Sequence, residues 1–294
     1  MNSIRTANLE ICYEEFGRKE DPPILILHGW PDAPRGWVKV ANALQSGGWR
    51  IVVPYLRGTW PTRFLTADTP RVGSGVALAQ DAIDLADHLR LERFAVVGHD
   101  WGARVGYTLG ALFPERLTAL TALSLAYQPH GVFSIPDFQQ SRRFWYQWFQ
   151  CVEGGATAVR KDPAGFARIQ WDTWSPPGWF DEAEFAATSQ AFLDPDWAAI
   201  TLNAYRARWM PGEVTDPRYD SLQQKLFIVE RLATPTLMIQ GASDSCDPPK
   251  ESEGQERFFT GRYRRVLLEG VGHFPHREAP DNVSAAILES LAAK

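Results

Sequence analysis

A carboxylate, Asp100, follows a short apolar run and sits between two glycines in the sequence FAVVGHDWG, residues 94–102. A tight turn from a strand into a helix requires small residues such as Gly98 and Gly102 at its two ends. A carboxylate at such a turn can attack saturated carbon, and water can then cleave the resulting ester at its carbonyl carbon. A serine would instead form an ether, which water does not cleave readily. Asp100 therefore predicts displacement at sp³ carbon, as in the opening of an epoxide or a carbon–halogen bond.

The second step of this chemistry needs a base that activates water. His273 lies late in the chain after an apolar run, and Asp244 lies just after another run, 236–239, where an acid that orients the histidine belongs. Asp247 is a rival acid three residues further on, and we favour Asp244 because it lies closer to the expected strand end. The chain order Asp100, Asp244, His273 matches the order of nucleophile, acid and base in the α/β-hydrolase fold.

Residues 24–31, ILILHGWP, form an apolar run that ends in an H-G-x-P motif. The loop after such a strand can supply one backbone N–H of an oxyanion hole, here from Trp30. The residue directly after the nucleophile, Trp101, can supply the other. His28 in the same motif is expected to be structural rather than catalytic.

These residues need a scaffold that brings distant segments together. Short apolar runs bounded by Gly or Pro alternate with segments of helical periodicity, which is typical of buried parallel strands connected by helices. The expected strands are 24–27, 49–53, 94–97, 117–125, 236–239 and 265–268, and the expected helices include 76–89, 103–113 and 280–293. The sequence therefore predicts an α/β fold with a mostly parallel sheet flanked by helices.

The stretch from about 127 to 212 interrupts this alternation with helical and aromatic segments, and seven of the 12 tryptophans lie in it. We interpret it as a helical cap inserted after the sixth strand. Residues 1–126 and 213–294 would then form the core domain of an α/β-hydrolase fold, and residues 127–212 the cap domain.

The composition is that of an ordinary globular protein. The 294 residues carry a net charge of −5, which argues weakly against a nucleic-acid or anionic-membrane partner. Three widely separated cysteines predict neither a disulfide framework nor a zinc site. The N-terminus has acidic residues where a signal peptide would be apolar, and no apolar run approaches the ~20 residues that cross a bilayer. We expect a cytoplasmic monomer or homodimer that requires no metal or organic cofactor.

The motifs HGWP, GHDWG, GASD and VGHF, in this order, resemble those of the α/β-hydrolase-fold epoxide hydrolases over nearly the whole chain. Members of that family use two cap tyrosines to hold and protonate the epoxide oxygen. The segments 144–150, FWYQWFQ, and 202–209, LNAYRARW, look like the family's tyrosine segments. The resemblance therefore implies that Tyr146 and Tyr205 have this role, and that an epoxide and water yield a vicinal diol.

The tryptophan-rich cap favours a large pocket for an apolar or aromatic epoxide, with Trp101, Trp145 and Trp148 as expected substrate contacts. Packing of the cap against the core is the alternative role of these rings. The loop 54–64, PYLRGTWPTRF, is more aromatic and basic than is usual in the family, and either lines the site or covers the core.

Haloalkane and fluoroacetate dehalogenases share much of this motif set. A haloalkane dehalogenase holds halide with Trp or Asn donors; Trp101 is available, but Trp30 occupies the position where Asn is often found. A fluoroacetate dehalogenase has a sequence like HDRGAR after its nucleophile, where arginine binds the substrate carboxylate. This chain reads HDWGAR, which keeps Arg104 but has Trp101 in place of the first arginine. That difference weakens the hypothesis that the substrate is a small acid such as fluoroacetate. A third hypothesis, a catalytically silent ligand-binding homologue, is disfavoured by the complete set of reacting residues.

Overall fold

The computed structural model describes residues 1–293 and contains one nine-stranded sheet in that part of the chain. The strands run in the order β1-β2-β4-β3-β6-β7-β8-β9, and β5 pairs with β2. β1, β2 and β5 pair antiparallel, whereas the strands from β4 to β9 pair in parallel. The strands are β1 (Asn2–Arg5), β2 (Leu9–Phe16), β3 (Pro23–Leu27), β4 (Arg50–Pro54), β5 (Arg63–Phe64), β6 (Phe94–His99), β7 (Leu117–Leu123), β8 (Thr236–Gly241) and β9 (Tyr263–Leu268).

The six predicted strands are confirmed as the parallel part of the sheet. Every residue of β4, β6 and β8 is buried, which explains why these strands are continuous apolar runs in the sequence. β7 ends at Leu123 rather than at the predicted Leu125, because Ser124 has a φ of 66° and leaves the strand conformation. The antiparallel strands β1, β2 and β5 were not predicted, since their residues lack both a continuous apolar run and a regular alternation.

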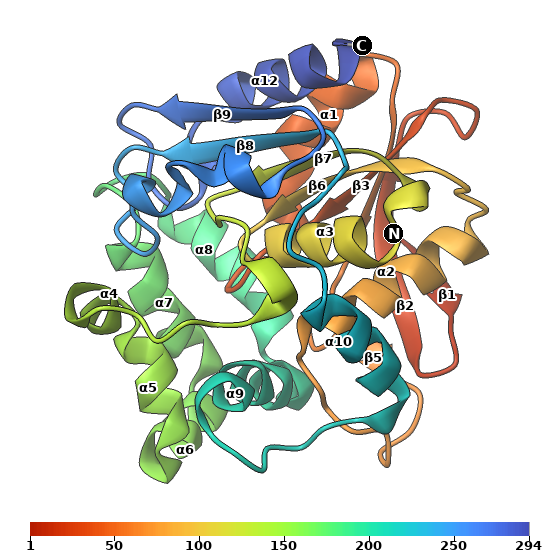
Figure 1. Cartoon of the computed structure of the whole chain (residues 1–294). Helices are drawn as coiled ribbons and strands as arrows, with labels where there is room; N and C mark the ends of the chain where they lie inside the picture. Colours follow the sequence, from red (N-terminus) through yellow and green to blue (C-terminus); the bar gives the residue numbers. More distant parts are fainter. Residues whose placement is uncertain (294) are drawn as a thin grey trace.

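Helices cover both faces of the sheet (Figure 1). Ile24 and Ile26 of β3 share a core with α1 and α12, whereas Leu25 and Leu27 share the opposite core with α2 and α3. This division follows from the alternation of side chains along a strand. The core helices are α1 (Val38–Ser46), α2 (Gly75–His88), α3 (Trp101–Leu112), α10 (Asp220–Phe227), α11 (Pro275–Glu278) and α12 (Pro280–Ala292).

Six of the seven α-helices between β7 and β8 form a group, gathered below and to the left of the sheet in Figure 1, and α10 follows them. The group follows the seventh strand in chain order, or the sixth if the two-residue β5 is set aside. The division into core and cap domains at residues 127 and 212 stays a prediction. The helices are α4 (Phe138–Arg143), α5 (Trp145–Cys151), α6 (Glu153–Lys161), α7 (Pro163–Thr173), α8 (Glu182–Ser189) and α9 (Pro195–Trp209).

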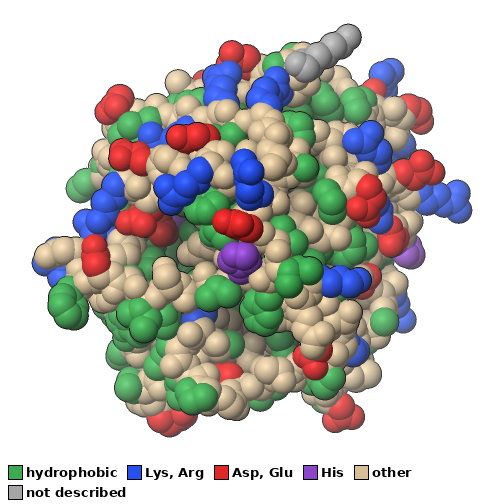
Figure 2. Space-filling model, viewed as in Figure 1, with side chains coloured by type: hydrophobic (Ala, Val, Ile, Leu, Met, Phe, Trp, Pro, Cys, Tyr) green, Lys and Arg blue, Asp and Glu red, His purple; other side chains and the backbone are tan. Residues whose placement is uncertain are grey.

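The surface carries charges of both signs. On the face viewed in Figure 1, Lys and Arg side chains lie among Asp and Glu side chains and are interspersed with hydrophobic ones (Figure 2). This mixture agrees with the small net charge of −5. Within residues 1–293, every helix falls short of the length or the hydropathy that spanning a membrane requires.

The loop at residues 54–64 packs on the core. Arg57 is buried and donates two hydrogen bonds to the Asp81 carboxylate, at 2.6 and 2.7 Å. The backbone N–H of Leu56 donates to Nε2 of His28 at 3.1 Å. Burial lowers the pKa of His28 to about 4, so its ring is neutral and can accept this bond. His28 therefore ties two loops together, which is a structural role.

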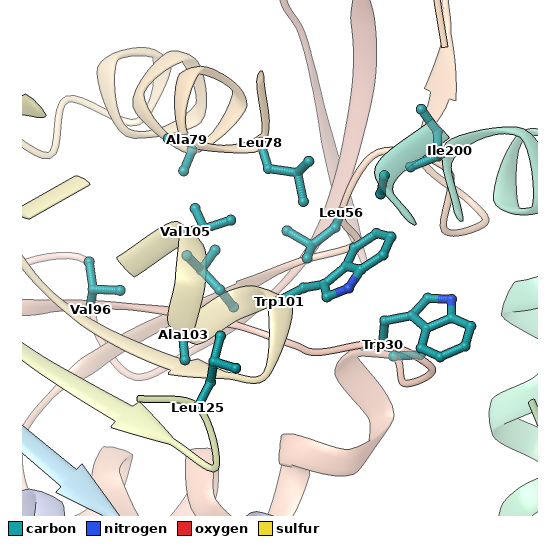
Figure 3. Packing of buried hydrophobic residues seen from close by; sticks show 14 of the residues in the cluster. Trp30, Leu56, Leu78, Ala79, Val96, Trp101, Ala103, Val105, Leu125 and Ile200 are labelled. Carbon is teal, nitrogen blue, oxygen red and sulfur yellow. The ribbon is translucent and has the colours of Figure 1, made fainter. Parts of the chain in front are cut away.

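Two glycines permit the turn between β6 and α3. A Cβ on Gly98 would lie 2.2 Å from the carbonyl oxygen of Gly102, and a Cβ on Gly102 would lie 2.0 Å from the carbonyl oxygen of Leu27. Behind the turn, Val96 of β6 and Val105 of α3 belong to the core shown in Figure 3. The beginning of α3 is therefore pressed against the end of β3, and side chains larger than hydrogen are excluded there.

We expect Gly102→Ala to lower the free energy of unfolding by about 3 kcal/mol, because the added methyl would overlap the Leu27 carbonyl. Gly110→Ala, in the same helix, is the matched control. Its Cβ would lie 3.5 Å from Oγ1 of Thr234, so it should raise the free energy of unfolding by about 0.5–1 kcal/mol. Urea unfolding monitored by circular dichroism measures both effects. Wild-type stability of Gly102→Ala would contradict the close contact.

Candidate active site

Asp100 occupies the turn between β6 and α3 with a strained backbone. Its φ of 49° is uncommon for a residue other than glycine, and its side chain is buried. The backbone N–H of Trp30 donates to Oδ1 of Asp100 at 2.9 Å. The other oxygen, Oδ2, lies 3.8 Å from Nε2 of His273. The carboxylate is thus held through one oxygen, and the second oxygen faces the imidazole.

Two backbone N–H groups were predicted to form an oxyanion hole. The structure records the bond from Trp30 to Asp100, on the oxygen that would become the carbonyl oxygen of an ester. The N–H of Trp101 begins α3, and no hydrogen-bond partner is recorded for it in the described part of the chain. It is therefore available at the N-terminus of a helix, where backbone N–H groups and the helix dipole favour negative charge.

His273 and Asp244 lie in the turns after β9 and β8, and adjacent parallel strands bring those turns together. Nδ1 of His273 lies 2.9 Å from Oδ2 of Asp244. The other oxygen of Asp244 accepts bonds from the backbone N–H groups of Cys246 and Asp247, each at 2.9 Å. Nε2 of His273 is buried without a hydrogen-bond partner in residues 1–293, and so it faces Asp100 unengaged.

Of the two carboxylates considered as the orienting acid, the structure brings Asp244 to the histidine. The side chain of Asp247 instead lines a small cavity together with Asp100 and Tyr146. Burial and then the charge of Asp244 raise the pKa of Asp247 to about 7. At neutral pH Asp247 is therefore partly protonated.

The electrostatics of His273 reflect its position among carboxylates. Burial lowers the pKa of His273, but the charge and hydrogen bond of Asp244, together with the charges of Asp100 and Asp247, raise that pKa to about 9. The ring is therefore an imidazolium at neutral pH. If Asp100 became an ester, its charge would vanish and the pKa of His273 would fall. The base would thus be released when the second step requires it.

Tyr146 of α5 and Tyr205 of α9 are buried above Asp100, with ring centres 5.4 Å apart and ring planes at 89°. Nε1 of Trp101 donates to the Tyr205 hydroxyl at 3.1 Å, and Nε2 of Gln147 donates to the Tyr146 hydroxyl at 3.1 Å. Burial raises the pKa of both phenols well above its ordinary value. Both hydroxyls therefore stay protonated and can donate to an oxygen that gains negative charge.

Two adjoining cavities lead away from Asp100. A small cavity of about 40 Å³ contacts Asp100, both tyrosines and Asp247. A larger cavity of about 420 Å³ lies next to it and has a mainly apolar lining. The residues that line both are Trp101, Arg104, Leu125, Gln128, Phe133 and Arg208. The arrangement offers a reacting centre with adjacent apolar space for a substituent.

Of the three tryptophans predicted to contact substrate, the structure brings only Trp101 to these cavities. Trp145 is 38% exposed and packs on Phe149 and Phe166. Trp148 packs on Trp209, with ring centres 4.5 Å apart. These two rings lie on other sides of α5 than Tyr146 and contribute to packing within the helical group, because successive residues of a helix point in different directions.

Among residues 1–293, two groups of buried or half-buried residues have donors close enough to hold a metal ion, namely Asp32 with His99 and His276, and Cys246 with Asp247 and His273. In the first group the Asp32 carboxylate already accepts bonds from His276 and Arg277. In the second, His273 is engaged through Nδ1 by Asp244. Both groups therefore have structural or electrostatic partners within the protein.

Sequence reasoning favoured Asp244 over Asp247 as the orienting acid, and Asp244 is the carboxylate that the structure places against the His273 ring. It missed Arg208. Arg208 lies three residues after Tyr205 in α9, a spacing that places both side chains on one face of a helix. That spacing is the feature of the sequence from which the position of Arg208 could have been predicted. The contribution of Asp247 to the cavity could not be read from spacing, because it depends on the path of the loop after β8.

Comparisons with known proteins identify the family and the relatives that this chain is similar to. Residues 22–280 match a family model described as alpha/beta hydrolase fold. Epoxide hydrolase A of Mycobacterium tuberculosis is 26% identical over 98% of this chain and 96% of its own length. Epoxide hydrolase 2 of Siraitia grosvenorii is 33% identical over 92% of each chain. A crystal structure from Klebsiella pneumoniae, whose assignment as an epoxide hydrolase is itself provisional, has 33% identity and a TM-score of 0.91, covering 99% of this chain and 96% of the other.

We expect Asp244→Asn to lower the pKa of His273 from about 9, because burial would then be opposed by fewer negative charges. The wild-type ring should stay protonated until the pH passes about 9, and the ring of the variant should lose its proton at lower pH. NMR titration of the imidazole resonances measures this. Asp247→Asn is the control and should cause a smaller decrease, since Asp247 makes no hydrogen bond to the ring. An unchanged His273 pKa in Asp244→Asn would contradict the pairing.

Proposed function

Because this chain belongs to the α/β-hydrolase-fold family and is similar over nearly its whole length to proteins named epoxide hydrolases, we propose that it opens an epoxide to a vicinal diol. The observation that carries the proposal is the cavity in which Asp100 meets Tyr146 and Tyr205. A carboxylate suits attack at sp³ carbon, and two protonated phenols suit a leaving group that is an oxygen.

In the first step, Oδ2 of Asp100 attacks a ring carbon and forms a C–O ester bond. The C–O bond of the epoxide breaks, its electron pair passes to the oxygen, and a proton from Tyr146 or Tyr205 neutralises that oxygen. The bond from the Trp30 N–H holds Oδ1, so that Oδ2 remains the attacking atom. The hydrogen bonds that Trp101 and Gln147 donate to the two hydroxyls support this step, because they stabilise the phenolate that remains.

In the second step, Nε2 of His273 removes a proton from water, and the oxygen of that water attacks Cγ of Asp100. The negative charge that develops on Oδ1 is stabilised by the N–H groups of Trp30 and Trp101. The bond between Cγ and Oδ2 then breaks, the departing oxygen takes the proton from His273, and the diol leaves with the oxygen that Asp100 had supplied. The second proton of the water, left on the Asp100 carboxyl group, returns to the phenolate and regenerates the tyrosine. Asp244 fixes the tautomer and the orientation of the ring throughout. This chemistry needs no metal or organic cofactor.

A haloalkane dehalogenase is the second candidate, since it would use the same nucleophile. It would hold the halide with donors such as the indole N–H groups of Trp30 and Trp101. Nε1 of Trp30 donates to Thr201 at 2.9 Å, and Nε1 of Trp101 donates to Tyr205 at 3.1 Å. Because both indoles are engaged, the geometry favours the epoxide over the halide. A silent ligand-binding homologue would not need the imidazole and carboxylate to face each other.

We expect His273→Gln treated with styrene oxide to accumulate an ester on Asp100, since attack would proceed and hydrolysis would lack its base. Intact-protein and peptide mass spectrometry should show one substrate added at Asp100. Asp100→Asn is the control and should remain unmodified. In the wild type, a single turnover in oxygen-18 water should place the label in Asp100 and leave the diol unlabelled. A labelled diol and an unlabelled Asp100 would mean that water attacks the epoxide directly.

We expect the double variant Tyr146→Phe with Tyr205→Phe to open styrene oxide about 10²- to 10⁴-fold more slowly, because the leaving oxygen loses its proton donors. Rapid-quench measurement of ester formation on Asp100 isolates this step. Each single variant should be less affected, since one donor remains. Halide release from bromoalkanes that persists in the double variant, with no wild-type activity on epoxides, would favour the dehalogenase.

A further inference from the structure

Two arginines that line the cavities at Asp100 have no carboxylate partner. Arg104 of α3 and Arg208 of α9 form no salt bridge with any residue from 1 to 293. Nε of Arg104 is buried without a hydrogen-bond partner in that range, and Arg208 has one long contact, 3.4 Å, to the side-chain oxygen of Gln147. The buried arginines Arg50 and Arg57 differ from this half-buried pair. Arg57 pairs with Asp81 at 2.6 Å, for example.

The two guanidinium groups also lie near each other. Cζ of Arg104 is 4.6 Å and Cζ of Arg208 is 4.2 Å from the centre of the Phe133 ring, so the two carbons are within about 9 Å of each other. Burial and then the positive charge of Arg104 lower the pKa of Arg208 to about 9. Two like charges in a partly buried site are costly unless an anion balances them.

The positions of Arg104 and Arg208 in their helices place both side chains near the reacting groups. Arg104 follows Asp100 by four residues in α3, and Arg208 follows Tyr205 by three residues in α9. Each guanidinium group therefore belongs to a side chain about one helical turn from a reacting group. Both arginines line the small cavity that contains Asp100 and the larger apolar cavity beside it. An anion held by both would sit at the junction of the two cavities.

We propose that the substrate is an epoxide that carries a carboxylate close to its ring, and that Arg104 and Arg208 bind this carboxylate. The planar guanidinium group matches a carboxylate in geometry as well as in charge. An apolar substituent on the far ring carbon would occupy the larger cavity, whose lining includes Val76, Leu78 and Tyr107. This inference rests on the proposed epoxide hydrolysis. It adds an anionic group to the apolar or aromatic epoxide expected from the sequence.

A role in balancing the charge of Asp100 is the alternative for these arginines. Asp100 has nearer partners, namely the N–H of Trp30 at 2.9 Å and the His273 ring at 3.8 Å, whereas neither arginine comes within the 4.0 Å of a salt bridge. Balancing Asp100 would affect charged and neutral substrates alike. Binding of a substrate carboxylate would affect the charged substrate alone, so the ratio of the two rates separates these roles.

The test compares β-phenylglycidate with β-phenylglycidamide, which has the same shape without the charge. We expect the wild type to show a kcat/KM about 10- to 100-fold higher for the acid than for the amide, as for one or two hydrogen bonds to a charged group. In Arg208→Met the acid-to-amide ratio should fall toward one, while the methionine preserves packing on Phe133. In Arg160→Gln, which removes an exposed arginine of the same helical group, the ratio should match the wild type. Thermal unfolding checks that both variants are folded.

Three results would separate failure of this inference from failure of the proposed function. Hydrolysis of both epoxides with an acid-to-amide ratio near one in the wild type would overturn the carboxylate site and leave the epoxide hydrolase intact. Inactivity toward both epoxides and toward styrene oxide would overturn the epoxide hydrolase. In that case, calorimetry with hydrocinnamate, which carries the carboxylate but lacks the epoxide, tests whether the two arginines bind an anion. Binding that Arg208→Met weakens by about 10-fold or more would support an anion site, and absence of binding to the wild type would overturn it.

Discussion

Close packing of the turn at Asp100 against the end of β3 positions the Asp100 carboxylate, the proposed nucleophile. The space between Gly102 and the Leu27 carbonyl admits no side chain, so α3 begins directly beside the strand. The chain that leaves that strand reaches Trp30 three residues later, and its N–H donates to the Asp100 carboxylate. One steric constraint therefore sets the positions of both the proposed nucleophile and the donor that orients it. The positive φ of Asp100 is the local strain that accompanies this arrangement.

The imidazole of His273 is held from several sides. Its ring bonds Asp244, and its backbone carbonyl accepts bonds from Ser124 and from the ring of His99. Its backbone N–H donates to Ser175, which lies beyond α7 in the helical group. The proposed base is thus fixed by the turns after two neighbouring strands and by the inserted helices together. A movement of those helices would therefore shift His273, because Ser175 contacts its backbone directly.

Trp30 links the helical group to the sheet. Its ring centre lies 5.6 Å from Tyr146, 5.1 Å from Tyr205 and 6.2 Å from Trp101, and its indole N–H donates to Thr201 of α9. Aromatic rings in such contact resist small displacements, because each fills the space between the others. The two tyrosines are consequently aimed at Asp100 by packing against a residue whose backbone also binds Asp100. Trp30 therefore supports both Asp100, the proposed nucleophile, and the two tyrosines, the proposed acids.

The sequence by itself determined the parallel sheet and the turn at Asp100, and it predicted an order of nucleophile, acid and base. These depend on local features, namely continuous apolar runs and two glycines at a fixed spacing, that do not change with the rest of the fold. It could not determine strands β1 and β2, where buried and half-buried residues do not alternate regularly. The sequence favoured Asp244 over Asp247, but the contact itself depends on tertiary structure, because the path of one loop decides which carboxylate meets the histidine. Only the tertiary structure directed Trp145 and Trp148 away from the cavity and brought Arg208 to it, because the rotation of a helix about its axis is set by packing with its neighbours.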